Sequence, residues 1–379
     1  MQGRRLRIQL SDRVRDTGHY RKRLKNTNTI SNTKKHMEAP NLDWGKLPFG
    51  YVKADYNVRC TYKDGKWGEI EVSDSEYVPL HIAASCLHYG QESFEGLKAF
   101  RGPDGKVRVF RMDENAKRFI RSAEGISMQP MPVELFEEMV RKVVKLNERF
   151  IPPYESGASL YIRPLEIGIS PKIGVSPAEE YMVIMLVTPV GPYFKAGFKP
   201  TKVCLSREYD RVAPKGTGSI KIGGNYAASL NAGQKAHDLG YAVMIYLDPK
   251  EKAYLDEAGA ANFYGIKGDT YVTPASETIL PSITNKSLRQ LARDMGMNVE
   301  ERHIPYEELS EFDEVGNCGT AAVCTPIGRI DDLDNGRVFE YDTVNPGPWT
   351  TKLYNKLRGI QYGTEPDTHS WCEIIEFDK

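Results

Sequence analysis

The sequence lacks several features that would place it in a specialised class of protein. No run approaches the roughly 20 apolar residues that cross a bilayer, and the most apolar segment, residues 181–190, is short and rich in β-formers. The six cysteines show no C-x-x-C spacing, so we expect neither a metal site nor a disulfide framework, and a reducing cytoplasm is favoured. We also expect no secretory signal. The formal net charge is zero, which argues against nucleic acid as the main partner.

The composition is ordinary for a soluble globular protein, with 40% hydrophobic and 27% charged residues. A chain of 379 residues is long enough for two domains. The segment 191–200 contains two glycines and two prolines and is typical of a connector. We therefore expect a mixed α and β protein with domains at 39–190 and 201–379 and a ligand at their junction.

The first 36 residues carry eleven Lys or Arg against Asp12 and Asp16, a local net charge of +9. Their low hydrophobicity and lack of helical period predict that residues 1–38 form a disordered, basic extension. Three origins stay open for it. It is a flexible tail or sequence upstream of a start at Met37, an organelle transit peptide, or a tail that binds nucleic acid.

Local patterns predict several helices and strands. Helices are expected after Asp113 as N-cap, over 132–150 with one apolar stripe, and over 282–296. Strands are expected at 159–168, 181–190, 203–208 and 241–248, and a hairpin pairs 253–266 with 270–275. There is no internal repeat and no low-complexity segment.

One lysine and one glutamate carry the strongest chemical signal. Lys221 lies in the uncharged run GSIKIGGNYAASL, before a Gly-Gly pair that lets backbone approach a ligand closely. Loss of water lowers the pKa of a lysine, which then reacts as a free amine. Glu257 interrupts a run of strand-like and small residues. A Schiff-base lysine and a carboxylate for a pyridinium nitrogen are the groups that a pyridoxal phosphate enzyme needs.

Other residues are candidates for binding charged groups. Ser282, Ile283 and Thr284 open a predicted helix, whose N-terminus favours a phosphate, and Arg118 could add a bidentate contact. The turn at 319–326 is rich in small residues and is suited to binding a carboxylate. Each of these residues also has an ordinary explanation, because surface lysines, strand-end acids, helix caps, tight turns and core aromatics are common. No P-loop or G-x-G-x-x-G string is present.

Taken together, the motifs resemble the branched-chain amino acid aminotransferases, which are fold type IV pyridoxal phosphate enzymes. The resemblance covers roughly residues 42 to 379. Its most specific strings, in family order, are HYGQESFEGLKAFRG (88–102), SLYIRPLEIG (159–168), GSIKIGGNY (218–226), LDEAGAANFY (255–264), ILPSIT (279–284) and GTAA (319–322).

The resemblance implies roles for the candidate residues. Lys221 would bond the cofactor aldehyde and shuttle a proton, and Glu257 would pair with the pyridine nitrogen. Arg163 would bind the distal carboxylate of glutamate. Arg118, Ile283 and Thr284 would bind the phosphate, and Leu280 and Tyr226 would contact the cofactor ring. The apolar pocket would be lined by Phe94, Tyr161, Tyr193 and Tyr226, and Tyr89 would help close the site. The main-chain N–H groups of Thr320 and Ala321 would donate to the substrate carboxylate.

Two departures from the family pattern limit what is carried over. Ala260-Ala261 stands where some relatives have Thr-Met, so a hydroxyl near the cofactor is missing. Cys324 stands alone where some animal members have a C-x-x-C pair, with Ala322 and Thr325 at the corresponding positions. Redox control of that type is therefore not expected.

The expected activity is reversible, ping-pong transamination of L-leucine, L-isoleucine and L-valine with 2-oxoglutarate. The resemblance also implies a homodimer. Two alternatives stay open. One is another fold type IV enzyme, a D-amino acid aminotransferase or aminodeoxychorismate lyase, and the other is a catalytically silent binding protein. The Tyr161-x-Arg163 pair and the string FEGLKAFRG favour the branched-chain interpretation.

Overall fold

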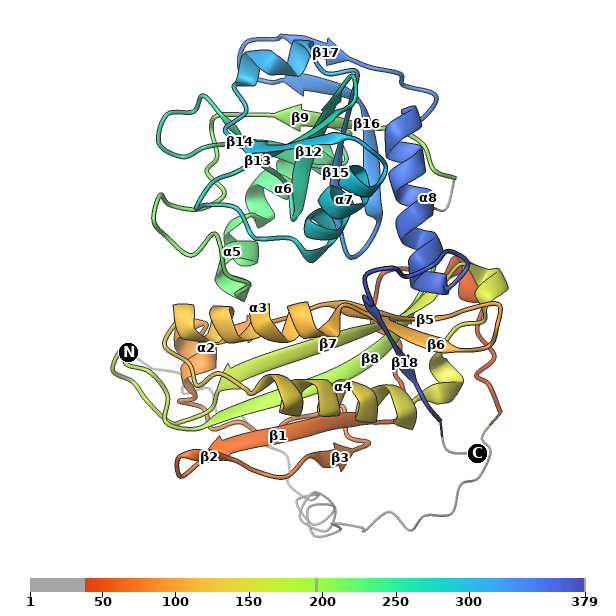
Figure 1. The fold of residues 1–379 in the computed structure, drawn as a ribbon. Helices are drawn as coiled ribbons and strands as arrows, with labels where there is room; N and C mark the ends of the chain where they lie inside the picture. The colour runs from red at the N-terminus through yellow and green to blue at the C-terminus, as the bar shows by residue number, and fades with distance from the viewer. Residues whose placement is uncertain (1–37, 195–196, 378–379) are drawn as a thin grey trace, which may run out of the picture. The chain divides into compact units, whose positions relative to one another are not determined.

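The computed structural model describes residues 38–194 and 197–377. Its first layer is a sheet of nine strands, which Figure 1 shows with its covering helices. Every strand pairing in this sheet is antiparallel. The strands in spatial order are β18 (Cys372–Ile375), β6 (Val107–Phe110), β5 (Leu97–Arg101), β7 (Ser159–Gly168), β8 (Tyr181–Val190), β1 (Asn57–Lys63) and β2 (Lys66–Trp67), with β3 (Glu71–Ser73) beside β1 and β4 (Glu92–Phe94) beside β7.

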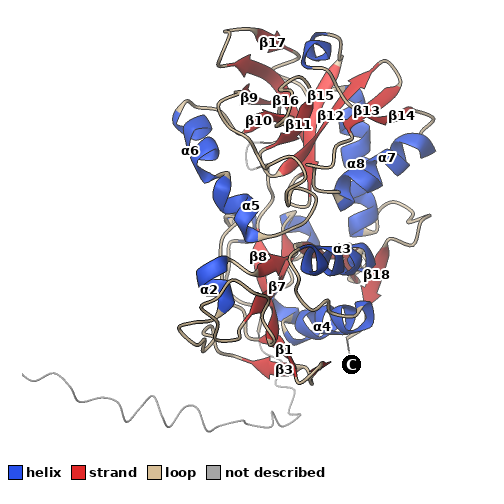
Figure 2. Ribbon diagram, turned by 90° about the vertical axis from the view of Figure 1, so that its left-hand side faces the viewer, coloured by secondary structure: helices blue, strands red, loops and turns tan. Residues whose placement is uncertain are grey.

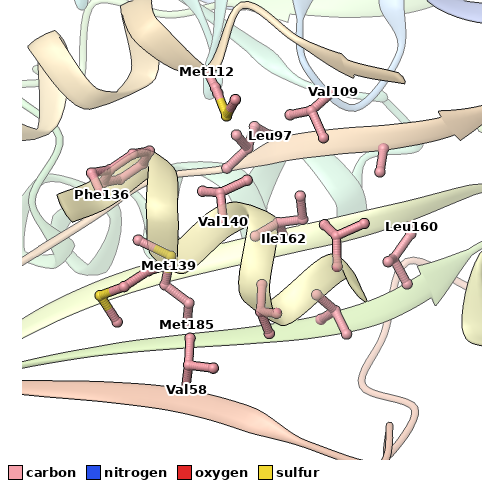
Figure 3. Close-up of a cluster of buried hydrophobic side chains, with 14 of the residues drawn as sticks. Val58, Leu97, Val109, Met112, Phe136, Met139, Val140, Leu160, Ile162 and Met185 are labelled. Atoms are coloured by element: carbon pink, nitrogen blue, oxygen red, sulfur yellow. The ribbon is translucent and has the colours of Figure 1, made fainter. Parts of the chain in front are cut away.

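Two amphipathic helices cover one face of this sheet. The helices α3 (Met112–Gly125) and α4 (Val133–Leu146) pack on each other, and α4 also packs on β8 and β1. Phe136, Met139 and Val140 recur at helical spacing, so they lie on one face of α4. Figure 3 shows these side chains pointing toward Ile162 and Met185 of the sheet. Burial of this apolar stripe stabilises the layer.

The second sheet is mixed and closes on itself. The strands in spatial order are β11 (Leu255–Ala258), β10 (Met244–Leu247), β9 (Thr201–Leu205), β16 (Val323–Asp332), β15 (Glu314–Gly319), β12 (Ala261–Lys267), β13 (Thr270–Pro274) and β14 (Asn298–Arg302), with β17 (Val338–Glu340) beside β16. Since β11 also pairs with β12, the six strands from β11 to β12 form a closed ring. Closure leaves these six strands without a free edge.

Helices border the second sheet and the junction between the sheets (Figure 2). Helices α7 (Ile283–Asp294) and α8 (Pro348–Tyr362) pack on each other and on β15, and α8 also contacts β5 and β6 of the first sheet. The remaining helices are α2 (Ser85–Tyr89), α5 (Gly223–Ala228) and α6 (Leu230–Asp238), and the 3-10 turns are η1 (Trp44–Lys46), η2 (Glu148–Phe150), η3 (Tyr154–Ser156) and η4 (Tyr306–Ser310).

The structure confirms the mixed α and β class and most predicted elements, with two corrections. The stretch 253–266 is not a single strand, because Gly259 adopts a left-handed conformation and folds β11 back on β12. Asp113 is not the N-cap of α3, because the helix begins one residue earlier and Arg111 takes the N-cap position. The strands predicted at 159–168 and 181–190 have the predicted bounds.

Two expectations are not settled by these contacts. The basic segment lies almost wholly outside the described residues. The division into domains at 191–200 stays a prediction, although the chain does pass from the first sheet to the second between β8 and β9. The strand β18 returns from the far end of the chain to join the first sheet. No helix among the described residues is long and apolar enough to span a bilayer.

Truncation of a core side chain on α4 tests this account of the packing. Phe136 is fully buried, with its ring 5.4 Å from that of Phe119. We expect Phe136→Ala to lower the free energy of unfolding by about 3–5 kcal/mol, since it removes apolar contacts and leaves a cavity. Chemical denaturation measures this loss. The matched control is Glu138→Ala, an exposed change on the same helix, which should stay within about 0.5 kcal/mol. Equal effects of both changes would contradict the packing.

Candidate active site

Lys221 belongs to the loop before α5, but its backbone is held by the first sheet and by α3. Its carbonyl oxygen accepts a hydrogen bond from the N–H of Phe94 in β4 (3.1 Å), and its own N–H donates to Oγ of Ser122 in α3 (2.9 Å). Ser93 forms a β-bridge with Ile222 beside it. The lysine is therefore fixed at the point where the two sheets meet.

The amine of Lys221 lies between two aromatic rings. Its Nζ donates to the hydroxyl of Tyr226 (2.7 Å) and lies 4.7 Å from the ring centroid of Phe94. Burial lowers the pKa of Lys221 to about 7, and the nearby positive charge of Arg118 acts in the same direction. A large fraction of this lysine is therefore an unprotonated amine at neutral pH.

A buried ion pair lies beside the lysine. Arg118 in α3 donates through Nε and an Nη to the two oxygens of Glu95 (2.6 and 2.8 Å), and its other Nη donates to the carbonyl of Pro281 (3.1 Å). Burial opposes ionisation of Glu95, but the charge and hydrogen bonds of Arg118, with Asn115, hold the pKa of Glu95 below its ordinary value. The pair thus joins α3 and the first sheet to the loop before α7.

The N-terminus of α7 faces this ion pair and carries free donors. Oγ of Ser282 caps the helix by accepting from the N–H of Asn285 (3.2 Å). Among the described residues, the N–H groups of Ile283 and Thr284 have no hydrogen-bond acceptor. Both residues line a small cavity with Thr320 and Asn115. Free N–H groups at a helix N-terminus beside an arginine suit a phosphate.

Glu257 is buried in β11 on the opposite side of the site. It accepts from Nδ2 of Asn262 (2.6 Å) and forms an ion pair with Arg211. Burial raises the pKa of Glu257 to about 7, and the neighbouring Asp256 adds to this, while the charge of Arg211 opposes it. Asn262 also donates to the carbonyl oxygen of Leu280 (3.0 Å), and Arg211 donates to the carbonyl oxygen of Thr278. The side chains that hold Glu257 therefore also hold the segment before α7.

The predicted aromatic residues are only partly brought together. The ring centroids of Phe94 and Tyr226 are 4.9 Å apart. Arg163 lies 4.8 Å above the ring of Phe94 and donates to the hydroxyl of Tyr161 (3.0 Å). Tyr193 is half exposed at the mouth of a separate cavity. Tyr89 donates to the carbonyl of Ile173, and no contact joins it to the lysine within the described part of the chain.

Gly96 makes the close packing of this wall possible. A Cβ atom at this position would collide with the hydroxyl of Tyr161. The absence of a side chain lets that ring lie against β5, so the glycine in the string FEGL is required for space rather than for a special backbone angle.

The turn at 320–322 joins β15 to β16 and also presents free donors. Within the described chain the N–H groups of Thr320, Ala321 and Ala322 have no hydrogen-bond acceptor. Val323, which follows the turn, has a φ of 70°, an unfavourable angle for a β-branched residue. Strained backbone of this kind persists where the surrounding structure holds it, commonly at functional sites.

The structure brings together two cysteines that are not close enough in sequence to form a C-x-x-C pair. Cys324 pairs in register with Cys318 across β15 and β16, on the two sides of this turn. Both thiols are free and buried, and burial raises their pKa values. Protonated, buried thiols react poorly, so the pair acts as apolar packing.

Sequence reasoning missed three polar residues that organise the site: Glu95, Arg211 and Asn262. Glu95 lies in the string FEGL and Asn262 in the string GAANF, and both strings were recognised. Nothing near either residue in the sequence identifies its partner, so neither was predicted as a site residue. Their importance comes from pairing across strands and loops, because a buried charge needs a counter-charge. An acid flanked by apolar residues in a predicted strand was the available signal for Glu95.

The residues present fit pyridoxal phosphate. The group needs a reactive amine, an acid at its ring nitrogen and donors for its phosphate. Lys221 supplies the first, Glu257 the second, and Arg118 with the unpaired N–H groups of Ile283 and Thr284 the third. Burial raises the pKa of Glu257, and a protonated pyridine beside it would stabilise its charged form. Among the described residues, no cluster of His, Cys, Asp and Glu is arranged to hold a metal ion.

Comparisons with known proteins agree with this chemistry. Residues 92–330 match the amino-transferase class IV family. The chain is 44% identical over 342 residues to the branched-chain-amino-acid aminotransferase of Haemophilus influenzae, covering 88% of this chain and 99% of that protein.

Solved structures give the same result. The branched-chain amino acid aminotransferase of Escherichia coli matches with a TM-score of 0.72 and 28% identity, over 86% of this chain and all of that one. A second branched-chain amino acid aminotransferase, solved in complex with N-(5'-phosphopyridoxyl)-L-glutamate, matches with a TM-score of 0.70 and 25% identity, over 86% of this chain and 100% of that one.

The lowered pKa of Lys221 can be measured by competitive labelling. We expect its reaction with trace acetic anhydride to rise as the pH increases through about 7 and then to level off, because the free amine is the reactive form. Mass spectrometry of the digest gives the rate at each pH. Lys63 is the internal control: it is exposed, and Glu180 raises its pKa. A Lys221 profile that follows that of Lys63 would disprove the proposed environment.

Proposed function

The chain belongs to the branched-chain-amino-acid aminotransferases of the class IV family, and from this premise we propose that it transfers the amino group of L-leucine, L-isoleucine or L-valine to 2-oxoglutarate with pyridoxal phosphate. The observation that carries the proposal is the amine of Lys221, buried between Phe94 and Tyr226 with a pKa lowered to about 7. The exchange is reversible and proceeds in two half-reactions, in which amino acid and 2-oxo acid use the site in turn.

When bound, pyridoxal phosphate supplies an aldehyde that condenses with amines and a ring that accepts the electron pair released at the substrate Cα. Arg118 and the N–H groups of Ile283 and Thr284 would bind its phosphate, and Glu257 would keep its ring nitrogen protonated. Leu280 would contact the ring, and Tyr226 would donate to the 3-oxygen. Tyr226 is suited to act as a donor because burial raises the pKa of its hydroxyl to about 12, so that the hydroxyl stays protonated.

Lys221 has two tasks in this scheme. Its Nζ would hold the cofactor covalently in the resting enzyme by condensing with the aldehyde, with loss of water. Once displaced by the amine of the substrate, it would take the proton from the substrate Cα and deliver it to the cofactor C4′, and it would move the proton in the opposite direction in the second half-reaction. A pKa near neutrality suits both tasks, since the amine is available as a base and, once protonated, as an acid. The hydroxyl of Tyr226 holds Nζ in place between transfers.

Selectivity follows from the walls of the site. Phe94, Tyr161 and Tyr226 provide apolar walls beside Lys221, while Tyr193 lines the separate cavity next to the 320–322 turn. Burial of a Leu-sized side chain contributes about 1.5–3 kcal/mol, and an unpaired carboxylate would be unfavourable there. Arg163 lies against the rings of Phe94 and Tyr161, and its buried Nε has no hydrogen-bond partner among the described residues, so it can meet the distal carboxylate of 2-oxoglutarate or glutamate. One pocket thereby serves apolar and acidic substrates.

The α-carboxylate common to all these substrates needs a separate site. The free N–H groups of Thr320 and Ala321 are the donors we assign to it. They belong to the same turn as Ala322, beside the cavity that Tyr193 lines.

We also propose that the active form is a homodimer. Ile82, Leu87, Ile173 and Val175 are between 59% and 85% exposed. Ile82 lies before α2 and Leu87 lies in it, and this segment is joined to the loop of Ile173 and Val175, because Ala84 bridges Pro171 and Tyr89 donates to Ile173. We infer that the four side chains form one apolar patch. Exposed apolar patches of this kind mark interaction surfaces. Tyr89 would then help close the site of the neighbouring subunit.

Two further assignments complete the proposal. The six free cysteines support a cytoplasmic location. The two sheets support domains at 39–190 and 201–379 joined by the segment 191–200, except that β18 near the end of the second range pairs with β6 of the first sheet.

An activity panel tests the reaction. We expect turnover of L-leucine with 2-oxoglutarate, a borohydride-dependent mass tag on Lys221, and at least a thousandfold loss of kcat in Lys221→Ala. Lys63→Ala, an exposed lysine, is the matched control and should retain full rate. Turnover of D-alanine without turnover of L-leucine would replace the proposal with a D-amino acid aminotransferase, and an untagged Lys221 would reject the mechanism.

The dimer is tested by placing a charge in the patch. We expect Val175→Asp to halve the mass measured by light scattering after size-exclusion chromatography, because a carboxylate would be buried without a partner. Val344→Asp is the control, since Val344 is 69% exposed outside the patch. A wild-type mass equal to one chain, or dissociation caused equally by both variants, would refute this interface.

A further inference from the structure

Lys98 is a buried lysine that the mechanism above does not use. It lies in β5 directly opposite Tyr161 of β7, so the two side chains share the face of the sheet that borders the substrate pocket. Only 6% of its surface is exposed. Its Nζ donates to the carbonyl oxygen of Ala321 at 2.8 Å, in the turn of the second sheet. A side chain of one sheet thus holds the carboxylate-binding turn of the other.

The charge of Lys98 has no counter-ion within the described residues. It lines a cavity of about 150 Å³ together with Arg358, Tyr193, Ala321 and Ala322. Arg358 donates to the hydroxyl of Tyr362 (2.8 Å), to the carbonyl oxygen of Gly157 (3.4 Å) and to Oε1 of Gln361 (3.5 Å), and no carboxylate of the described chain pairs with it. Burial, with the nearby charge of Arg358, lowers the pKa of Lys98 to about 7. Two cations without an acid make this cavity attractive to anions.

The geometry of the 320–322 turn depends on a contact from outside the turn. The turn contains three consecutive free N–H groups and is followed by Val323 in a strained conformation, so its geometry is not fixed by its own hydrogen bonds. In a trans peptide the carbonyl and the following N–H point in opposite directions. The bond from Lys98 to the Ala321 carbonyl therefore fixes this peptide plane, with the N–H of Ala322 directed away from the lysine.

We propose that Lys98 is a positioning residue for recognition of the substrate α-carboxylate. It holds the Ala321 carbonyl, which fixes the peptide between Ala321 and Ala322 and so restrains the short turn that carries the N–H groups of Thr320 and Ala321. Its charge acts with that of Arg358 to attract carboxylates to this turn. The proposal rests on the assignment of the turn as the carboxylate site. Lys98 also lines the small cavity beside Ile283 and Thr284, but its amine is bonded to the carbonyl of Ala321. We therefore expect its effect on substrate binding rather than on the proton transfer.

The test compares a carboxylate with its neutral amide. The probes are 4-methylvalerate and 4-methylpentanamide, used as inhibitors of the holoenzyme. We expect Lys98→Met to weaken 4-methylvalerate at least tenfold and to raise KM for both L-leucine and 2-oxoglutarate. Inhibition by the amide, cofactor affinity and the absorbance of the bound cofactor should change less than twofold. Lys98→Arg, which keeps the cation and a donor, should restore most of the carboxylate affinity.

Two further variants make the result decisive. Lys106→Met, an exposed lysine in the turn that follows β5, is the matched control and should behave as wild type. Lys98→Gln keeps a donor for Ala321 without the charge, and it serves where the Met variant does not fold. For Lys98→Gln we expect the affinity for 4-methylvalerate to fall about threefold.

Three outcomes would overturn the proposal: unchanged 4-methylvalerate inhibition in both neutral variants, equal weakening of the acid and the amide, or no recovery in Lys98→Arg. Failure of the proposed activity is distinguishable from these outcomes. A wild-type protein that does not turn over L-leucine can still be titrated with 4-methylvalerate and followed by the cofactor absorbance.

Discussion

The buried ion pair between Arg118 and Glu95 is the interaction on which the rest of the site depends. Two charges removed from water must compensate each other, since an unpaired buried charge costs several kcal/mol. Their bidentate contact fixes α3 against β4 and β5 and leaves one Nη of the arginine on Pro281. The phosphate site that we propose and part of the lowering of the pKa of Lys221 both depend on where this arginine is held.

The site is built from both sheets, and neither supplies a working half alone. The backbone of Lys221 is held by β4 and α3, although the residue precedes helices of the second sheet. Lys98 makes the converse contact, from β5 to the turn between β15 and β16. Such reciprocal contacts bring an amine, an acid and two sets of free N–H groups together around one ligand. They also exclude water, which is what shifts the pKa values of Lys221 and Glu257.

The parts predicted well from sequence were those with local or chemically unusual signals. The strands at 159–168 and 181–190 and the Ser282 cap of α7 follow from patterns within a few residues. Helix α8 was missed, although Pro348 at its start and Gly363 at its end are ordinary boundary signals, because its apolar period is weak. The hairpin at 253–266 was misjudged because the left-handed turn at Gly259 lies inside an apolar run.

The sequence by itself determined which chemistry is available: a lysine in a glycine-rich loop, a lone glutamate, a capped helix and a small-residue turn. These properties are encoded locally, by residue type and spacing. The tertiary structure alone decided that Glu95 neutralises Arg118, that Arg211 faces Glu257, that Cys318 lies opposite Cys324, and that Lys98 reaches Ala321. Pairing across a sheet or between sheets depends on register and packing, and residues far apart in the chain carry no local trace of it.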